Sequence, residues 1–217
     1  MTDLDALASA IRAERGTPVS RLGYFCAPFQ PDSGPFLDRV IKVYRGLRDA
    51  AALDRLAQAH ADYVTAIRAS GVPLPETAFH LLDDGPRRIP VIVQEALPQS
   101  SLMRPRMMAE PLADTLVLMQ AAGDVIARFW HWSITEEALH LSDRIGFHPS
   151  IRNLAVIDGK AVFFDTFPPL IGYTRDEMGQ LLLLFSESRL MRTVGPLVQA
   201  RLTSVQDEWY SPPETLV

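Results

Sequence analysis

Two residues with oxygen-bearing side chains, Asn153 and Asp165, flank a sequence that is typical of a tight β-hairpin. Asp158-Gly159 stands between two short apolar runs, and this dipeptide favours a two-residue type I′ turn. Such a turn places Asn153 opposite Phe164, so that Asn153 and Asp165 emerge together at the open end of the hairpin. An amide oxygen beside a carboxylate suits a hard cation such as magnesium, with water and phosphate in the remaining positions. In the structural alternative, Asp165 caps a strand and Asn153 bonds to a turn.

A lysine inside an apolar strand is the second feature that could take part in chemistry. Lys42 lies in the run VIKVY, and Lys160 is the only other lysine among the 21 lysine and arginine residues of the chain. A charge among apolar neighbours is costly unless it faces a polar site. We therefore interpret Lys42 as a ligand-binding residue. The alternative is an edge-strand lysine whose ammonium group reaches water.

Hydrophobic periodicity and turn residues predict the elements that must position these side chains. In chain order we expect a helix within residues 1–15, strands at Leu22–Phe29 and Phe36–Tyr44, a helix from Asp49 to Ala69, strands at Thr77–Leu82 and Pro90–Ala96, a linker from Leu97 to Pro111, a helix from Leu112 to Trp132, paired strands within Leu154–Phe164, and a helix that opens at Thr174. This order predicts an α+β fold of two lobes, residues 1–97 and 98–217, with ligands bound in a cleft between them.

The segment FHPSIRNLAVIDGKAVFFDTF resembles the stretch from the catalytic loop to the metal-binding turn of protein-kinase-like phosphotransferases, which include the aminoglycoside phosphotransferases. Asn153 falls on the asparagine of the family's loop, and Asp165 falls on its metal-binding aspartate. VIKVY resembles the strand whose lysine binds phosphates, and PVIVQEALP resembles the strand that enters the hinge. By this resemblance Glu95, Ala96 and Leu97 offer backbone groups to an adenine.

Further matches to this family follow the family's order and cover roughly residues 36–167. ASGVPLPE resembles the end of the helix before the fourth strand, and AGDVIARFWHW resembles the helix before the catalytic loop. The resemblance implies a two-lobed protein-kinase-like fold. Its C-terminal lobe would be small and reduced, because only about 50 residues follow Asp165.

The chain departs from the family's pattern at several positions. Where the family carries its catalytic aspartate, five residues before the loop asparagine, this chain has His148. A histidine can act as a general base near neutral pH, or it can mark a chain that no longer transfers phosphate. Where the family has a glutamate that pairs with the lysine, the nearest residues are His60 and Asp62, and no glycine-rich loop precedes the lysine. Arg152, just before the asparagine, could add positive charge near a phosphate.

Together these residues predict an enzyme that transfers a phosphoryl group from ATP, with magnesium, to a small hydroxylated metabolite. Lys42 would bind the α- and β-phosphates, and Asn153 and Asp165 would bind the magnesium ion. His148 would orient or deprotonate the acceptor hydroxyl. The alternatives are a pseudokinase that holds a nucleotide or a partner protein without turnover, and a different nucleotide-dependent enzyme on the same fold.

Composition excludes several other classes of protein. The 217 residues are 47% hydrophobic and 22% charged, and the net charge of −5 comes without a basic stripe that would favour nucleic acid. The apolar run Leu181–Phe185 is too short to span a bilayer. A single cysteine, Cys26, permits no internal disulfide and suits a reducing compartment. We therefore expect a cytoplasmic protein that binds a small molecule; the sequence does not fix its oligomeric state.

Overall fold

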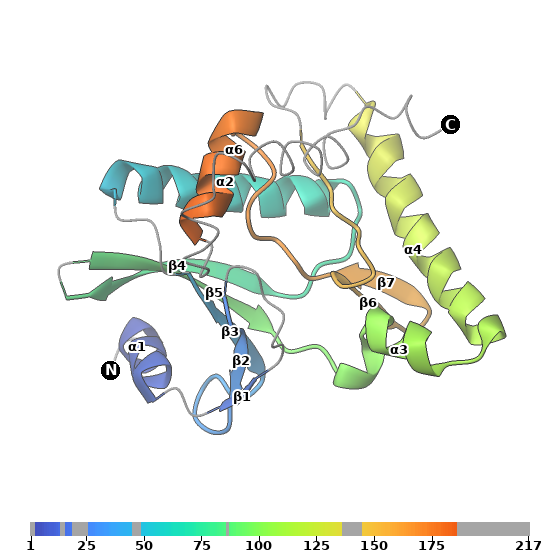
Figure 1. Cartoon of the computed structure of the whole chain (residues 1–217), viewed down its shortest axis with the longest axis horizontal. Coiled ribbons are helices and arrows are strands. Elements are labelled where there is room, and N and C mark those ends of the chain that lie inside the picture. Colours follow the sequence, from blue (N-terminus) through green and yellow to red (C-terminus); the bar gives the residue numbers. More distant parts are fainter. Residues whose placement is uncertain are drawn as a thin grey trace. The chain divides into compact units, whose positions relative to one another are not determined.

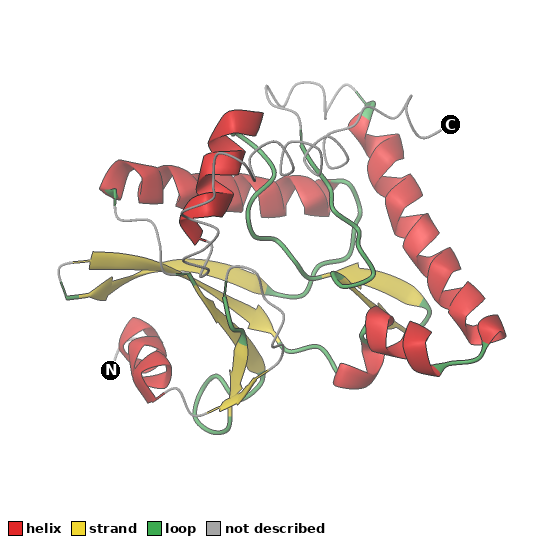
Figure 2. Cartoon of the chain, in the orientation of Figure 1, coloured by secondary structure: helices red, strands yellow, loops and turns green. Residues whose placement is uncertain are grey.

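The computed structural model describes residues 3–13, 16–18, 26–44, 49–85, 87–135 and 145–185, which adopt the α+β arrangement expected from the sequence (Figure 1, Figure 2). The described residues form two compact units, the first drawn from Met1–Gln58, Glu76–Ala96 and Gly179–Gln199, and the second from Ala59–Pro75, Leu97–Met178 and Ala200–Val217. Within these ranges no helix is long and apolar enough to cross a membrane.

A five-stranded sheet, in which every pairing is antiparallel, forms the centre of the first unit. Its strands are β1 (Gly16–Pro18), β2 (Phe29–Pro31), β3 (Arg39–Val43), β4 (Thr77–Asp84) and β5 (Arg87–Glu95), in the spatial order β1-β2-β3-β5-β4. β3 is therefore an interior strand, and its register with β5 sets Lys42 opposite Ile92. The edge-strand explanation for Lys42 is wrong.

Helix α1 (Asp3–Ala13) covers one face of this sheet (Figure 1). Its buried residues Leu7 and Ile11 are four positions apart, so they lie on one side of the helix. They pack in one cluster with Ile41 of β3 and other apolar side chains of the sheet. Successive side chains of a strand point to opposite faces. Lys42, which follows Ile41, therefore lies on the face of the sheet opposite α1.

The long helix α2 (Ala50–Ala69) begins and ends where the sequence predicts. Asp49 caps its start, because the Asp49 carboxylate accepts a hydrogen bond of 2.8 Å from the Ala52 amide. Gly71 follows its end with a φ of 75°, a left-handed conformation that favours glycine. Residues of α2 up to Gln58 belong to the first unit, and the later ones belong to the second.

In the second unit, two helices pack against a two-stranded hairpin. The elements are the short 3-10 helix η1 (Gln99–Ser101), α3 (Met103–Ala109), α4 (Leu112–Ser133), β6 (Leu154–Ile157) and β7 (Lys160–Phe163). The Phe147 ring joins them, since its centroid lies 4.6 Å from that of Phe129 on α4 and 5.0 Å from that of Phe163 on β7. The Phe163 amide also donates a hydrogen bond of 2.9 Å to the Pro73 oxygen, which ties the outer edge of β7 to the chain after α2.

The capping box expected at Thr174 is present. The Thr174 amide donates to the Glu177 carboxylate at 2.8 Å, and the Glu177 amide donates to the Thr174 hydroxyl at 3.3 Å. Helix α6 (Arg175–Phe185) follows directly. The residues after it lie outside the described ranges.

The strand that the sequence predicts at Leu22–Phe29 differs from the strand in the structure. A strand was predicted from Leu22, but β2 begins only at Phe29. Residues 26–28 are irregular, and residues 22–25 lie outside the described ranges. Pro28 has no amide hydrogen to donate to a neighbouring strand, which limits pairing at this point.

The stretch Leu97–Pro111 is more than the linker that its polar composition predicts, because η1 and α3 form within it. Met103 at the start of α3 is fully buried. The Arg106 side chain bonds to Glu110 at 2.6 Å and to the Val156 oxygen of β6 at 3.3 Å. A helix of two turns is too short for a hydrophobic period to reveal it, so the sequence pattern gave no sign of α3.

Candidate functional site

The hairpin of β6 and β7 brings Asn153 and Asp165 to its open end, as the sequence predicts. The turn residues Asp158 and Gly159 have φ values of 49° and 72°, which a type I′ turn requires. Pairing continues beyond the strands through a 3.0 Å hydrogen bond from the Phe164 amide to the Asn153 oxygen. Asp165 is the next residue along the chain.

The Asn153 side chain is oriented by His148. Its amide nitrogen donates to the His148 backbone oxygen at 3.2 Å and lies 3.3 Å from the ring atom Nδ1. A carbonyl oxygen can only accept, so this bond identifies which end of the Asn153 amide is the nitrogen. The other end, Oδ1, makes no hydrogen bond with the part of the chain that the structure describes. That oxygen is therefore available to a cation.

The same contact favours one tautomer of a neutral His148 ring. The Asn153 nitrogen carries two hydrogens and can donate one to the backbone oxygen and one to Nδ1, so Nδ1 is an acceptor. A neutral imidazole whose Nδ1 accepts carries its proton on Nε2. In this tautomer Nε2 has no lone pair with which to accept a proton.

Thr166, the residue after Asp165, is anchored to α2. Its hydroxyl oxygen lies 3.1 Å from Nε2 of His60, and the exposed fractions of the two residues are 0% and 2%. His60 had been considered, with Asp62, as a partner for the strand lysine. The structure places the His60 ring against Thr166, in the turn after Asp165, and leaves Asp62 exposed.

A second contact from α2 supports the segment before His148. The Tyr63 hydroxyl donates a hydrogen bond of 3.1 Å to the Gly146 oxygen, and the Gly146 amide donates one of 2.7 Å to the Leu170 oxygen. Within the second unit, α2 thus holds both chain segments that carry the candidate site. One segment leads into His148, and the other follows Asp165.

Lys42 belongs to the first unit, where it is buried with 8% of its surface exposed. It shares a sheet face with its partner Ile92 and, by strand alternation, with Arg88. Arg88 forms an ion pair of 3.0 Å with Asp54 near the start of α2, so this part of α2 lies on the Lys42 face. The Lys42 side chain therefore lies on the covered face of an interior strand, and it does not leave the sheet at an edge.

Two of the three backbone amides in the predicted adenine-binding stretch are hydrogen-bonded to other residues of the first unit. The Glu95 amide donates to the Glu76 oxygen at 2.8 Å, and the Ala96 amide donates to the Asp38 oxygen at 2.9 Å. The Leu97 amide makes no hydrogen bond with the described residues. The amides of Glu95 and Ala96 are therefore already used by protein oxygens.

Arg152 lies beside Asn153 with an exposed side chain. Its backbone amide donates to the Ser150 hydroxyl at 3.3 Å, which helps to shape the turn between His148 and Asn153. The Arg152 side chain is thus on the surface. It is not part of the buried framework of the site.

These residues suit magnesium only in company with a phosphate-bearing ligand. The described ranges contain no group of three or more His, Cys, Asp or Glu side chains arranged to hold a metal. Asn153 and Asp165 supply one amide oxygen and one carboxylate. Magnesium in nucleotide sites is commonly held by one or two protein side chains together with phosphates and water. The donor set fits a magnesium–nucleotide complex better than an ion held by protein alone.

Sequence reasoning missed the contacts that α2 makes with the site. His60 and Tyr63 are three positions apart and lie on one side of the helix, where the pattern indicates only a core face. One signal was present, because a histidine on an apolar stripe must find a hydrogen-bond partner when it is buried. The sequence alone gives no indication that this partner is Thr166.

Comparison with known proteins gives a family and no activity. Residues 3–217 match a family described as a family of unknown function, DUF6206. No curated protein matches the chain.

Proposed function

We propose that this chain, which belongs to the DUF6206 family, transfers a phosphoryl group from a magnesium–ATP complex to the hydroxyl of a small metabolite. The observation that carries the proposal is the orientation of Asn153. His148 holds its nitrogen, which leaves Oδ1 for a cation at the end of the hairpin where Asp165 follows. This is the pair of oxygens that the resemblance to kinase-like phosphotransferases implies for magnesium.

The order of the elements supports the same proposal. α2 lies between β3 and β4, the stretch after β5 leads out of the sheet, and the hairpin follows α4. This order along the chain is the one that the resemblance implies for the corresponding kinase-like elements. The proposal therefore includes a two-lobed kinase-like fold with lobes 1–97 and 98–217, and a cytoplasmic location.

Each candidate residue has one role in the proposed reaction. Lys42 binds the α- and β-phosphates through its ammonium group, while Asn153 and Asp165 hold the magnesium ion. The bound magnesium neutralises charge on the phosphates. The acceptor oxygen bonds to the γ-phosphorus as the bond from that phosphorus to the bridging oxygen of ATP breaks. ADP leaves, and the acceptor proton passes to water or to a phosphoryl oxygen.

His148 orients the acceptor in this scheme and does not deprotonate it. A neutral ring whose Nδ1 accepts from Asn153 carries its proton on Nε2 and therefore cannot take the acceptor proton at that atom. Phosphoryl transfer through a loose transition state depends on positioning and charge neutralisation, and it makes small demands on a base. The replacement of the family's aspartate by His148 is compatible with turnover for this reason.

A second candidate function is nucleotide binding without transfer. Two observations favour it: the Nδ1 of His148 is engaged by Asn153, and the amides of Glu95 and Ala96 are engaged within the sheet. A chain that only holds a nucleotide needs neither a base at position 148 nor a full set of adenine contacts. This candidate shares the magnesium site with the first and differs from it in turnover.

Thermal melting with a panel of nucleotides, with and without magnesium, tests the shared part of both candidates. Binding to the native state raises the melting temperature by mass action. We expect stabilisation by ATP with magnesium, and Asp165→Asn should remove the magnesium-dependent part. Asp114→Asn, which changes an exposed carboxylate in the first turn of α4, is the matched control. If no nucleotide changes the melting temperature, both candidate functions are contradicted.

Transfer of radiolabelled γ-phosphate to a pool of hydroxylated metabolites separates the two candidates. The wild-type chain should label an acceptor, and His148→Asp, which restores the family's residue, should retain or raise that labelling. Tight magnesium–nucleotide binding without labelling in either protein favours the binding function.

A further inference from the structure

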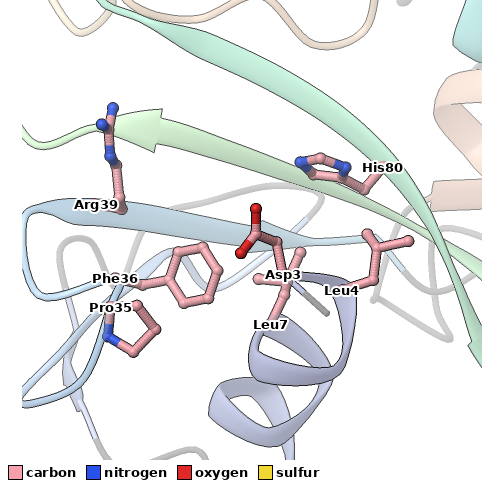
Figure 3. Close-up of a pocket in the computed structure, with 7 residues that line it drawn as sticks. All are labelled: Asp3, Leu4, Leu7, Pro35, Phe36, Arg39 and His80. Atoms are coloured by element: carbon pink, nitrogen blue, oxygen red, sulfur yellow. The ribbon is translucent and has the colours of Figure 1, made fainter. Parts of the chain in front are cut away.

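A pocket of about 290 Å³ lies in the first unit, between α1 and the sheet (Figure 3). Its lining includes Asp3 and Leu4 of α1, Pro35 and Phe36 of the turn before β3, Arg39 of β3 and His80 of β4. The pocket is on the α1 face of the sheet, whereas Lys42 is on the opposite face. The proposed nucleotide function therefore does not use it.

The cationic group of the pocket, the Arg39 guanidinium, is already paired with protein carboxylates. Arg39 forms an ion pair of 2.7 Å with Glu76 and a second of 3.5 Å with Asp38. The hydrogen bond to Glu76 raises the pKa of the Arg39 guanidinium, which keeps the group charged. Figure 3 shows the guanidinium pointing away from the Asp3 carboxylate. These two carboxylates offset the charge of the guanidinium, so its attraction for a carboxylate on a ligand is reduced.

Two polar side chains remain for a ligand. The Asp3 carboxylate and the His80 ring both line the pocket, and neither makes a hydrogen bond with the described residues. Burial lowers the pKa of the His80 imidazole below its usual range, so the ring is neutral near pH 7. A neutral imidazole has one nitrogen that accepts a hydrogen bond. Asp3 and His80 together thus offer acceptors to a donor group.

The remaining walls and the charge of the pocket narrow the class of ligand. Leu4, Pro35 and Phe36 provide an apolar lining, and Phe36 lies near Asp3 in Figure 3. Among the described residues, the carboxylates of Asp3, Asp38 and Glu76 outnumber the Arg39 guanidinium at and beside the pocket. The local excess of negative charge favours a cation over an anion.

From this arrangement we infer that the pocket binds a small organic amine with an apolar body. The ammonium group donates to the Asp3 carboxylate and to the His80 ring, and the body packs against Leu4, Pro35 and Phe36. The volume is at the lower end of the range for small-molecule pockets, which limits the body to about one ring or a short alkyl chain.

Three probes that share one aromatic body test the inference on the full-length chain: 2-phenylethylamine, 2-phenylethanol and phenylacetate. Titration is followed by the ring resonances of His80, assigned by their loss in His80→Gln. We expect saturable shifts with the amine, and binding of the alcohol and the acid at least about 10-fold weaker, because they lack the charge-assisted hydrogen bond to Asp3. Equal binding of the three probes, or no saturation by the amine, overturns the inference.

Asp3→Asn should weaken binding of the amine about 10- to 100-fold, since it removes the charge that the ammonium group meets. Asp5→Asn is the matched control, because Asp5 also lies in the first turn of α1 but does not line the pocket. It should leave the affinity unchanged. An equal loss in both variants would assign the effect to α1 as a helix and would contradict a site at Asp3. Phe36→Leu supplies an independent check, because it should weaken the amine and the alcohol alike.

Discussion

The side-chain nitrogen of Asn153 contacts two atoms of His148, the backbone oxygen at 3.2 Å and the ring Nδ1 at 3.3 Å. The candidate metal ligand therefore favours the tautomer of a neutral His148 ring that carries its proton on Nε2. The same hydrogen bonds turn Oδ1 of Asn153 away from the histidine. The orientation of the Asn153 amide and the tautomer of the His148 ring therefore depend on the same two hydrogen bonds.

Asn153→Asp should exchange the tautomer of His148. A carboxylate cannot donate, so it favours a proton on Nδ1, where the wild-type ring has a lone pair. Nitrogen NMR of labelled histidine should show Nε2 protonated in the wild type and Nδ1 protonated in the variant. The signals of His131, at the end of α4, serve as the internal control and should not change. A wild-type spectrum with the proton on Nδ1 would contradict the assignment.

Lys42→Met should weaken nucleotide binding about 10- to 100-fold, the effect of losing one hydrogen-bonded charge on a phosphate. Methionine keeps the unbranched stem in the buried position and removes only the charge. Lys160→Met is the matched control, because Lys160 is exposed on β7 and is the only other lysine of the chain. Affinities are measured by titration calorimetry with the magnesium–nucleotide complex. Equal affinities in the two variants would remove Lys42 from the proposed site.

Local signals in the sequence were sufficient for the hairpin and for α2. Asp158-Gly159 specifies its turn through backbone conformation, and Asp49 and Gly71 mark the ends of the helix through capping. Each of these signals acts within a few residues. These signals can therefore be interpreted without the tertiary structure.

The contacts that depend on distant residues could not be predicted. His60 and Thr166 are 106 positions apart, and only packing decides that they meet. The amides of the hinge stretch illustrate the same limit, because Ala96 bonds to Asp38 through a sheet register that periodicity does not specify. The pocket beside α1 was missed for this reason too, since its lining comes from segments far apart in the sequence.

Thr166→Val should lower the free energy of unfolding by about 1–3 kcal/mol, because it keeps the shape of the side chain but leaves the buried His60 ring without the threonine hydroxyl. Thr166→Ser retains the hydroxyl and loses one methyl group, so it should cost about 1 kcal/mol. Urea unfolding of the three proteins gives the comparison.

The same two variants test whether the contact positions the turn that we propose to bind magnesium. The magnesium-dependent part of nucleotide stabilisation should fall in Thr166→Val and persist in Thr166→Ser. If the serine variant loses more than the valine variant by both measurements, packing of the methyl group and not the hydrogen bond to His60 holds this turn.

Protonation of His80 should make the fold less stable in mildly acidic solution. Burial lowers the pKa of the His80 ring in the folded state, while the unfolded chain keeps the ordinary value near 6.5. Above that value the ring is neutral in both states and contributes no pH dependence. As the pH falls below it, the unfolded state binds the proton first, so the free energy of unfolding falls until the folded pKa is reached.

His80→Gln isolates this contribution, because glutamine keeps a polar side chain that does not titrate. The difference in free energy of unfolding between wild type and variant should be constant above pH 7 and should shift in favour of the variant as the pH falls below about 6.5. Urea unfolding at half-unit steps of pH measures it. His131→Gln, at the end of α4, is the control for the loss of a histidine in general. A constant difference across the whole range would mean that the His80 ring has the same affinity for protons in both states, and that burial in the pocket does not hold it neutral.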